Sequence, residues 1–202
     1  MVRVKACGVT SVEDALACVD AGVDAIGVNL IATSPRFVDE ATALAIAKAV
    51  GGRALVVGVV ADLDADAMLA LRERLELGCL QLHGDEPPEA LAPLLPHAYK
   101  AIRVTRAEDV ARADAYGGEH VLLDGAAPGT GARFDWALAA PLAKRRKVTL
   151  AGGLGPENVD EAIRVVSPYC VDVASGVEAP GEPRRKDPAR VRALVARVHR
   201  AR

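Results

Sequence analysis

Short runs of hydrophobic residues recur along the chain and alternate with longer segments that mix apolar and charged residues. The short runs are rich in valine, isoleucine and leucine, a composition typical of buried β-strands. The eight runs predicted as strands are residues 3–7, 25–30, 54–61, 78–83, 98–104, 120–124, 147–151 and 171–176. The segments between them are rich in Ala, Leu, Arg and Glu at helical spacing, so the pattern predicts eight strand–helix units.

Three helix starts can be predicted from local residues. Ser11 precedes Val-Glu-Asp, and the two acidic side chains suit the positive end of a helix dipole. The sequence Gly-Pro-Glu-Asn places Pro156 where the first turn of a helix tolerates proline. A last amphipathic helix is predicted from Asp187 and Pro188 to the C-terminus.

Strands that alternate with helices pair in parallel through right-handed crossovers. Eight such units in 202 residues predict an α/β fold, a compact (β/α)8 TIM barrel, with a doubly wound open sheet as the alternative. No Pro/Ser-rich linker or low-complexity stretch interrupts the pattern. We therefore expect one barrel domain over residues 1–202.

The charge balance limits the classes of partner. With a net charge of −2, the chain lacks the basic surface typical of proteins that bind nucleic acid or anionic membranes. No apolar run approaches the ~20 residues of a membrane helix, and the N-terminus lacks a secretory hydrophobic region. We therefore expect a cytoplasmic protein with no nucleic-acid or membrane partner.

The cysteines are scattered and show neither a C-x-x-C motif nor the spacing of a zinc site, so no metal is predicted. We expect free thiols at all four positions, which are Cys7, Cys18, Cys79 and Cys170. Cys7 has two interpretations, as a small buried hydrophobic residue or as a reactive thiol at the end of a strand.

In a (β/α)8 barrel, the active site lies at the C-terminal ends of the strands. The residues with chemical potential near those ends are Cys7, Asn29, His83, Asp124, Gly152, Gly153, Ser175 and Gly176. Because they recur around one rim, we expect them to form one site.

Side chains alternate between the two faces of a strand, so the strand ends also predict which residues face the barrel interior. The predicted inward-facing residues are Lys5, Cys7, Cys79, Gln81, His83, Leu122, Asp124, Asp172 and Ala174. The first and last strands are neighbours in a closed barrel, and a lone buried charge is unfavourable. Lys5 and Asp172 should therefore pair, either only to neutralise each other or also to favour a Cys7 thiolate.

Several loops carry candidate binding groups, each with a simpler structural alternative. The glycine-rich segments 151–158 and 174–178 suit backbone binding of a phosphate, or are ordinary turns. Segment 125–134 is either a lid over the substrate or a surface loop. Arg36 either clamps a carboxylate or is solvated, and His83 either contacts the ligand or holds its loop.

Taken in order, these segments resemble the phosphoribosylanthranilate isomerase family. The shared motifs are VKACGVT, SPRFV, VVGVV, QLHGDE, D-x4-GTG-x2-FDW, LAGGLGPENV and DVASGVE…KD. They span nearly the whole chain, and the family fold is a (β/α)8 barrel. The resemblance implies an Amadori rearrangement in tryptophan biosynthesis, by proton transfers that need no metal or redox cofactor.

The resemblance also implies residue roles. Cys7 of the K-x-C-G motif is expected to be the general base, partly ionised, and Asp124 the general acid, partly protonated. Arg36 is expected to hold the anthranilate carboxylate. The substrate-binding residues implied or predicted in addition are His83 and the loop residues Gly152, Gly153, Ser175 and Gly176.

Two positions depart from the family pattern. Pro128 replaces a common glycine and is expected to stiffen the lid, and Ala174 replaces a common serine at the floor of the phosphate site. Alternatives to this family are indole-glycerol-phosphate synthase, a ribose-phosphate epimerase, the ketose isomerase of the imidazole branch, and a barrel that only binds a phosphorylated metabolite. The expected partner is a phosphorylated small molecule, and the expected state is a monomer or homodimer.

Overall fold

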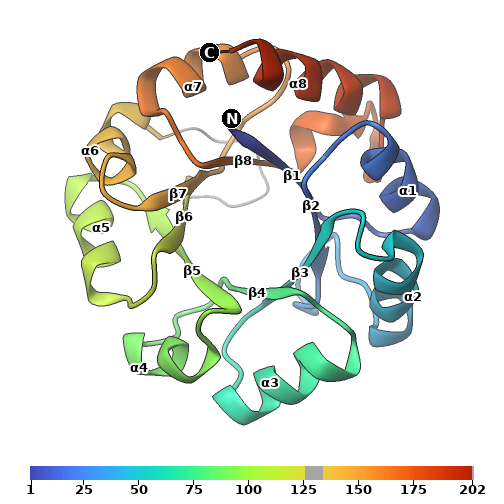
Figure 1. Ribbon diagram of the computed structural model, residues 1–202, viewed down its shortest axis with the longest axis horizontal. Coiled ribbons are helices and arrows are strands. Elements are labelled where there is room, and N and C mark those ends of the chain that lie inside the picture. The colour runs from blue at the N-terminus through green and yellow to red at the C-terminus, as the bar shows by residue number, and fades with distance from the viewer. Residues whose placement is uncertain (126–133, 202) are drawn as a thin grey trace.

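The computed structural model describes residues 1–125 and 134–201 and contains a closed barrel of eight parallel strands (Figure 1). The strands are β1 (Arg3–Cys7), β2 (Ala25–Asn29), β3 (Leu55–Val60), β4 (Cys79–Leu82), β5 (Ala98–Val104), β6 (His120–Gly125), β7 (Lys147–Leu150) and β8 (Cys170–Val173). The first strand closes the barrel, because Lys5 is in register with Ala25 of β2 and with Asp172 of β8. The predicted barrel is confirmed, and the open sheet is wrong.

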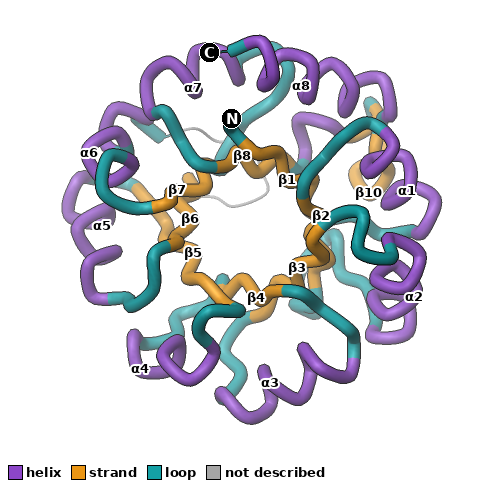
Figure 2. Tube along the Cα trace, viewed as in Figure 1, coloured by secondary structure: helices purple, strands orange, loops and turns teal. Residues whose placement is uncertain are grey.

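Helices surround the barrel as an outer ring (Figure 2). They are α1 (Val12–Asp20), α2 (Glu40–Val50), α3 (Ala65–Arg74), α4 (Pro88–Leu91), α5 (Ala107–Ala111), α6 (Ala140–Ala143), α7 (Val159–Val166) and α8 (Pro188–Arg200). Three of them, α4 to α6, have only four or five residues and are followed or preceded by 3-10 turns. In the described part of the chain, none of the helices has the length and apolarity needed to cross a membrane.

Two of the three predicted helix starts are confirmed. The Ser11 side chain accepts a hydrogen bond from the Asp14 N–H and caps α1, and Asp187 caps α8 in the same way. The expected helix turn at Pro156 is wrong, because α7 begins three residues later. The Asn158 side chain accepts from the Gly155 N–H and donates to the Gly153 carbonyl, and so holds this segment as a loop.

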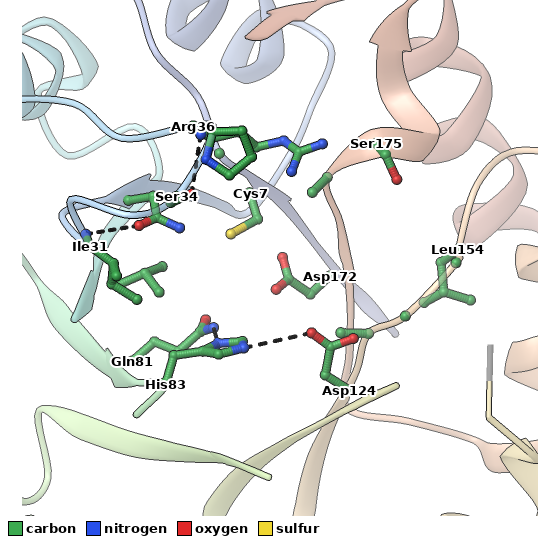
Figure 3. Close-up of a pocket in the computed structure, with 18 of the residues that line it drawn as sticks. Cys7, Ile31, Ser34, Arg36, Gln81, His83, Asp124, Leu154, Asp172 and Ser175 are labelled. Carbon is green, nitrogen blue, oxygen red and sulfur yellow. Dashed lines mark hydrogen bonds and ion pairs between the residues drawn. The ribbon is translucent and has the colours of Figure 1, made fainter. Parts of the chain in front are cut away.

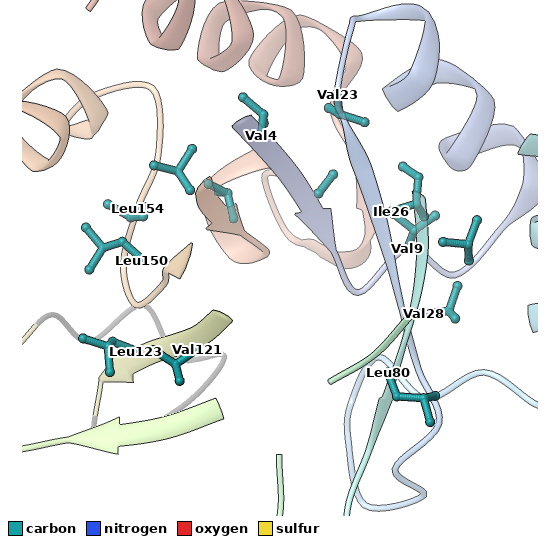
Figure 4. Close-up of a cluster of buried hydrophobic side chains, with 14 of the residues drawn as sticks. Val4, Val9, Val23, Ile26, Val28, Leu80, Val121, Leu123, Leu150 and Leu154 are labelled. Atoms are coloured by element: carbon teal, nitrogen blue, oxygen red, sulfur yellow. The ribbon is translucent and has the colours of Figure 1, made fainter. Parts of the chain in front are cut away.

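The main core lies between the strands and the helices (Figure 4). It takes the outward-facing side chains, such as Val4 and Ala6 on β1 and Leu80 and Leu82 on β4, all buried. A smaller apolar cluster fills the barrel interior and consists of Ala25, Val57, Cys79, Tyr99, Ala101, Leu122 and Ala151. The predicted alternation of inward and outward faces is therefore confirmed.

The last strand is followed by a hairpin that the sequence pattern did not predict. The run expected over 171–176 ends as a strand at Val173, and a hairpin of β9 (Glu178–Ala179) and β10 (Glu182–Lys186) follows before α8. Arg184 of this hairpin donates hydrogen bonds to the carbonyls of Pro35 and Phe37. The hairpin therefore holds the loop after β2, which carries Arg36.

Candidate active site

A cavity of about 430 Å³ lies at the C-terminal end of the barrel strands (Figure 3). The predicted site residues that line it are Cys7, Arg36, His83, Asp124, Gly152, Gly153 and Ser175. They come from loops or strand ends that are far apart in sequence, and barrel closure brings them together.

Cys7 ends β1 and points into this cavity. Its neighbour on β2 is Gly27, where a Cβ atom would lie 2.8 Å from the Cys7 Sγ and 3.0 Å from the Lys5 Nζ. Burial, followed by the charge of Asp172, raises the pKa of the Cys7 thiol, whereas Lys5 and Lys186 lower it by a smaller amount. Desolvation therefore outweighs the nearby ammonium groups in its effect on the pKa of Cys7, and the partial ionisation of this thiol stays a prediction.

Asp124 lies at the end of β6 on the far side of the same cavity and is almost completely buried. Its Oδ1 accepts a hydrogen bond from the Gly125 N–H at 2.8 Å. Burial raises the pKa of this carboxyl to about 6, even though that hydrogen bond opposes the shift. Near neutral pH, a useful fraction of Asp124 is therefore protonated, as a general acid requires.

Lys5 and Asp172 form the predicted ion pair, with 3.0 Å between Nζ and Oδ2, and Asp172 lines the cavity. Burial alone would lower the pKa of Lys5, but attraction to Asp172, Cys7 and Tyr99 raises it well above its usual value. The charged form of Lys5 is therefore favoured, and the predicted pair with Asp172 is confirmed.

Gln81 connects this ion pair to His83. Its Oε1 accepts hydrogen bonds from the Lys5 Nζ and from the Tyr99 hydroxyl, both at 3.0 Å. Its Nε2 lies 2.8 Å from the Nδ1 of His83, whose Nε2 lies 3.8 Å from the Asp124 Oδ2. Burial and the neighbouring cations lower the pKa of His83 to about 4, so the ring is neutral at physiological pH.

Arg36 is buried at the edge of the cavity and is not a solvated surface arginine. Its Nε and Nη2 donate to the two carboxylate oxygens of Glu178 at 2.6 and 2.8 Å. The Lys186 ammonium lies 3.2 Å from the same carboxylate. The hydrogen bonds to Glu178 raise the pKa of Arg36, whereas burial lowers the pKa of Lys186 although Glu178 opposes that shift.

Glu178 and Lys186 are functional candidates that the residue pattern did not single out. Both belong to the D-V-A-S-G-V-E…K-D motif, which was the available signal. Their contact with Arg36 cannot be predicted from a local sequence pattern, because 142 residues separate Arg36 from Glu178. Lys186 is fully buried, and it also donates to the Ala174 carbonyl at 3.1 Å.

The glycine loops after β7 and β8 adopt different roles. Gly152 and Gly153 line the cavity with φ angles of 87° and 65°, a conformation that glycine adopts without strain. Gly176 is not among the described residues that line the cavity. A Cβ atom there would overlap the Leu154 carbonyl oxygen, so this glycine allows the two loops to pack together.

Two further expectations concern the departures from the family pattern. Ala174 lines the cavity, as its position in the motif implied. The lid predicted over 125–134, with Pro128 in it, falls almost entirely on residues 126–133 and lies outside the described residues. Among the residues that are described, no cluster of three or more His, Cys, Asp or Glu side chains is placed to hold a metal ion.

Comparison with known proteins identifies the family. The model of the family described as N-(5'phosphoribosyl)anthranilate (PRA) isomerase matches residues 4–197. The chain belongs to the phosphoribosylanthranilate isomerase family. It is therefore an isomerase of tryptophan biosynthesis, and the alternative phosphosugar enzymes and the binding-only barrel are set aside.

Relatives in this family match the chain along nearly its whole length. The N-(5'-phosphoribosyl)anthranilate isomerase of Myxococcus xanthus is 49% identical over 203 residues, which cover 96% of this chain and 94% of the relative. The crystal structure of the Thermotoga maritima isomerase superimposes with a TM-score of 0.91 at 36% identity and covers 98% of this chain and 99% of that one. A second isomerase structure holds reduced 1-(o-carboxyphenylamino)-1-deoxyribulose 5-phosphate and superimposes with a TM-score of 0.89 at 36% identity, with 98% and 99% coverage.

Proposed function

We propose that the protein converts N-(5-phosphoribosyl)anthranilate to 1-(2-carboxyphenylamino)-1-deoxyribulose 5-phosphate, with Asp124 as general acid and Cys7 as general base. The observation that carries this proposal is the placement of a carboxyl group and a thiol in one cavity. Asp124 and Cys7 face one cavity from β6 and β1, and burial raises the pKa of Asp124 to about 6 (Figure 3). A carboxyl and a thiol placed in this way can act on two positions of one bound sugar.

The reaction divides into two proton transfers. Asp124 donates its proton to the ribose ring oxygen, the bond from C1 to that oxygen breaks, and the nitrogen lone pair forms a C1=N iminium. Cys7 as a thiolate then takes the C2 proton, the C–H electrons form a C1=C2 bond, and the iminium electrons return to nitrogen. The resulting enolamine tautomerises to the ketone, so C2 is oxidised as C1 is reduced and no electrons are exchanged with a partner.

The raised pKa values of Asp124 and Cys7 determine how activity depends on pH. The active form needs a protonated Asp124, with a pKa of about 6, and an ionised Cys7, whose pKa is raised by burial. Between these pKa values, the loss of protonated carboxyl with rising pH is offset by the gain of thiolate. We therefore expect activity to change little across the neutral range. The iminium cation formed in the first step favours the thiolate further.

The remaining groups suit the two charged ends of this substrate. We place its carboxylate at the cluster of Arg36, Glu178 and Lys186, where two basic side chains meet one carboxylate. We place its phosphate on backbone N–H groups of the loops that carry Gly153 and Ser175, with no lysine required. The scissile ring would then lie between the two ends, next to Cys7 and Asp124. We also propose that the enzyme is cytoplasmic, which its free cysteines and near-neutral charge support. Its proposed state is a monomer or homodimer.

The experiment follows loss of the substrate's fluorescence in the wild type, Cys7→Ala and Asp124→Asn. Each substitution should lower kcat by at least ~10²-fold, the size of a lost acid–base contribution. Cys18→Ala is the matched control, because Cys18 is a buried free thiol on the helix side of the barrel. Its kcat should stay near that of the wild type. Near-wild-type turnover in Cys7→Ala or Asp124→Asn would remove that residue from the mechanism.

A further inference from the structure

The hydrogen bonds from Lys5 and Tyr99 determine the orientation of the Gln81 amide, which lines the cavity. Lys5 carries an ammonium group, which can only donate hydrogen bonds, so the Gln81 atom at 3.0 Å from it must be the oxygen. The Tyr99 hydroxyl occupies the second acceptor position of that oxygen, also at 3.0 Å. A flipped amide would place its NH2 group against a cation. The Gln81 nitrogen therefore points away from Lys5.

The orientation of Gln81 in turn determines the protonation of His83. The Gln81 amide nitrogen is a donor, and it lies 2.8 Å from the Nδ1 of His83 (Figure 3). Nδ1 must accept this hydrogen bond and carries no proton. In a neutral imidazole, the proton then resides on Nε2. That atom is the one that faces the Asp124 carboxyl, at 3.8 Å from its Oδ2.

We propose that Gln81 is a positioning residue that holds His83 in the Nε2–H tautomer, so that His83 faces Asp124 as a donor and never as an acceptor. The proposal rests on the proposed role of Asp124 as the general acid. The opposite tautomer would aim a lone pair at the carboxyl and attract its proton. The Nε2–H tautomer leaves the proton of Asp124 available for the substrate and stabilises the carboxylate that remains after transfer.

The spatial arrangement explains why such an orienting device is needed. His83 follows β4 and is only partly buried, whereas Asp124 lies in β6 and is buried, so the side chain that faces this carboxyl affects its protonation. His83 lies beyond the end of β4, whereas Gln81 lies within β4 and accepts hydrogen bonds from Lys5 and Tyr99. The charge on Lys5, itself paired with Asp172, anchors the whole chain of hydrogen bonds to the barrel interior.

The first test reads the tautomer directly in the wild type. In protein with 15N-labelled histidine, NMR should show His83 with a protonated Nε2 and an unprotonated Nδ1, assigned by the loss of these signals in His83→Gln. A proton on Nδ1 would overturn the proposal. This measurement is independent of activity, so it separates failure of the inference from failure of the proposed mechanism, which Asp124→Asn tests.

The second test reverses the hydrogen bond. In Gln81→Glu, a carboxylate oxygen replaces the amide nitrogen that faces Nδ1, so His83 should gain a proton on Nδ1. The signals of His199 should not change, because His199 is exposed on α8, outside the barrel. We expect kcat to fall about tenfold while KM changes little. A wild-type spectrum of His83 in a folded Gln81→Glu protein would overturn the proposal.

The third test asks whether Gln81 acts through Asp124. In an Asp124→Asn background, Gln81→Glu should cause no additional loss of kcat, because the carboxyl that His83 serves is already gone. Gln81→Leu should behave in the same way. A purely structural role would instead give losses that multiply, and that result would also overturn the proposal.

Discussion

Strand β1 brings the two environments of this barrel side by side. Val4 and Ala6 face the helices and are buried in an aliphatic layer, whereas Lys5 and Cys7 face the barrel axis among polar groups. The outer layer stabilises the fold by removing apolar surface from water. The inner layer holds charges and titratable groups away from water, and the cost of burying a charge is visible in the raised pKa values of Cys7 and Asp124.

Within the inner layer, the groups differ in how well they are compensated. Lys5 is balanced by Asp172 at 3.0 Å, so this charge is neutralised where it is most deeply buried. Asp124 has a hydrogen bond from the Gly125 N–H and no ion pair with a lysine or arginine among the described residues, and its pKa rises to about 6. Stability and chemistry are therefore carried by opposite faces of the same strands, and substitutions on the two faces should separate them.

The largest effect on stability should come from the outer face. Leu80→Ala removes a fully buried side chain from the layer between β4 and the helices and should lower the free energy of unfolding by about 2–5 kcal/mol. The kcat of the folded fraction should remain within about twofold of the wild type, since Leu80 does not line the cavity. Urea titration and the fluorescence assay measure the two quantities. A large loss of kcat at full folding would show that the two faces are coupled.

A substitution on the inner face should change the free energy of unfolding in the opposite direction. The folded-state pKa of Asp124 is about 6, above the value of about 3.9 in an unfolded chain, so ionised Asp124 destabilises the fold. Asp124→Asn should therefore raise the free energy of unfolding at pH 7 by about 2–3 kcal/mol while it removes activity.

The pH dependence checks the cause of that stabilisation. The contribution of Asp124 to stability is greatest below pH 4 and falls as pH rises to about 6, so the advantage of Asp124→Asn should shrink towards zero at pH 4. Urea titrations at several pH values give this profile. If the difference in free energy of unfolding between Asp124→Asn and the wild type is the same at pH 4 and pH 7, the stabilisation does not come from removal of the carboxylate.

A smaller effect is expected at the edge of the cavity. Arg36→Met removes binding that the ground state and the transition state share, so KM should rise about tenfold with kcat little changed. Glu178→Gln keeps the guanidinium but weakens the fork that orients it, and KM should rise by less. Steady-state kinetics on both variants tests whether KM rises more in Arg36→Met than in Glu178→Gln. An unchanged KM in Arg36→Met would make Arg36 a structural residue only.

The smallest effect concerns the inner ion pair and the thiol. Lys5 lowers the pKa of Cys7 against the larger effect of burial, so Lys5→Met should raise that pKa and slow alkylation of Cys7 several-fold at pH 8. The control is Lys5→Met with Asp172→Asn, which removes both charges and should restore part of the rate, since Asp172 raises the same pKa. An unchanged alkylation profile in folded Lys5→Met would mean that Lys5 serves only to neutralise Asp172.

The sequence by itself determined the barrel and the faces of its strands. Period-two alternation is a local property of the chain, and it places Cys7 and Asp124 near strand ends on the inner face. The same alternation turns Lys5 and Asp172 inward, and closure of the barrel then pairs them. Once eight such strands close in order, the identity of the neighbours follows without further information. The free thiols and the caps at Ser11 and Asp187 are local in the same sense.

Only the tertiary structure decided which residues of the site contact one another. Arg36 and Glu178 meet because a hairpin after β8 folds against the loop after β2, and no local pattern specifies such a contact. A side chain at Gly176 would overlap the Leu154 carbonyl oxygen, and this contact between two loops cannot be read from either segment alone. The direction of the Cys7 pKa shift depends on burial against several charges at once. That balance exists only after the barrel has closed and excluded water.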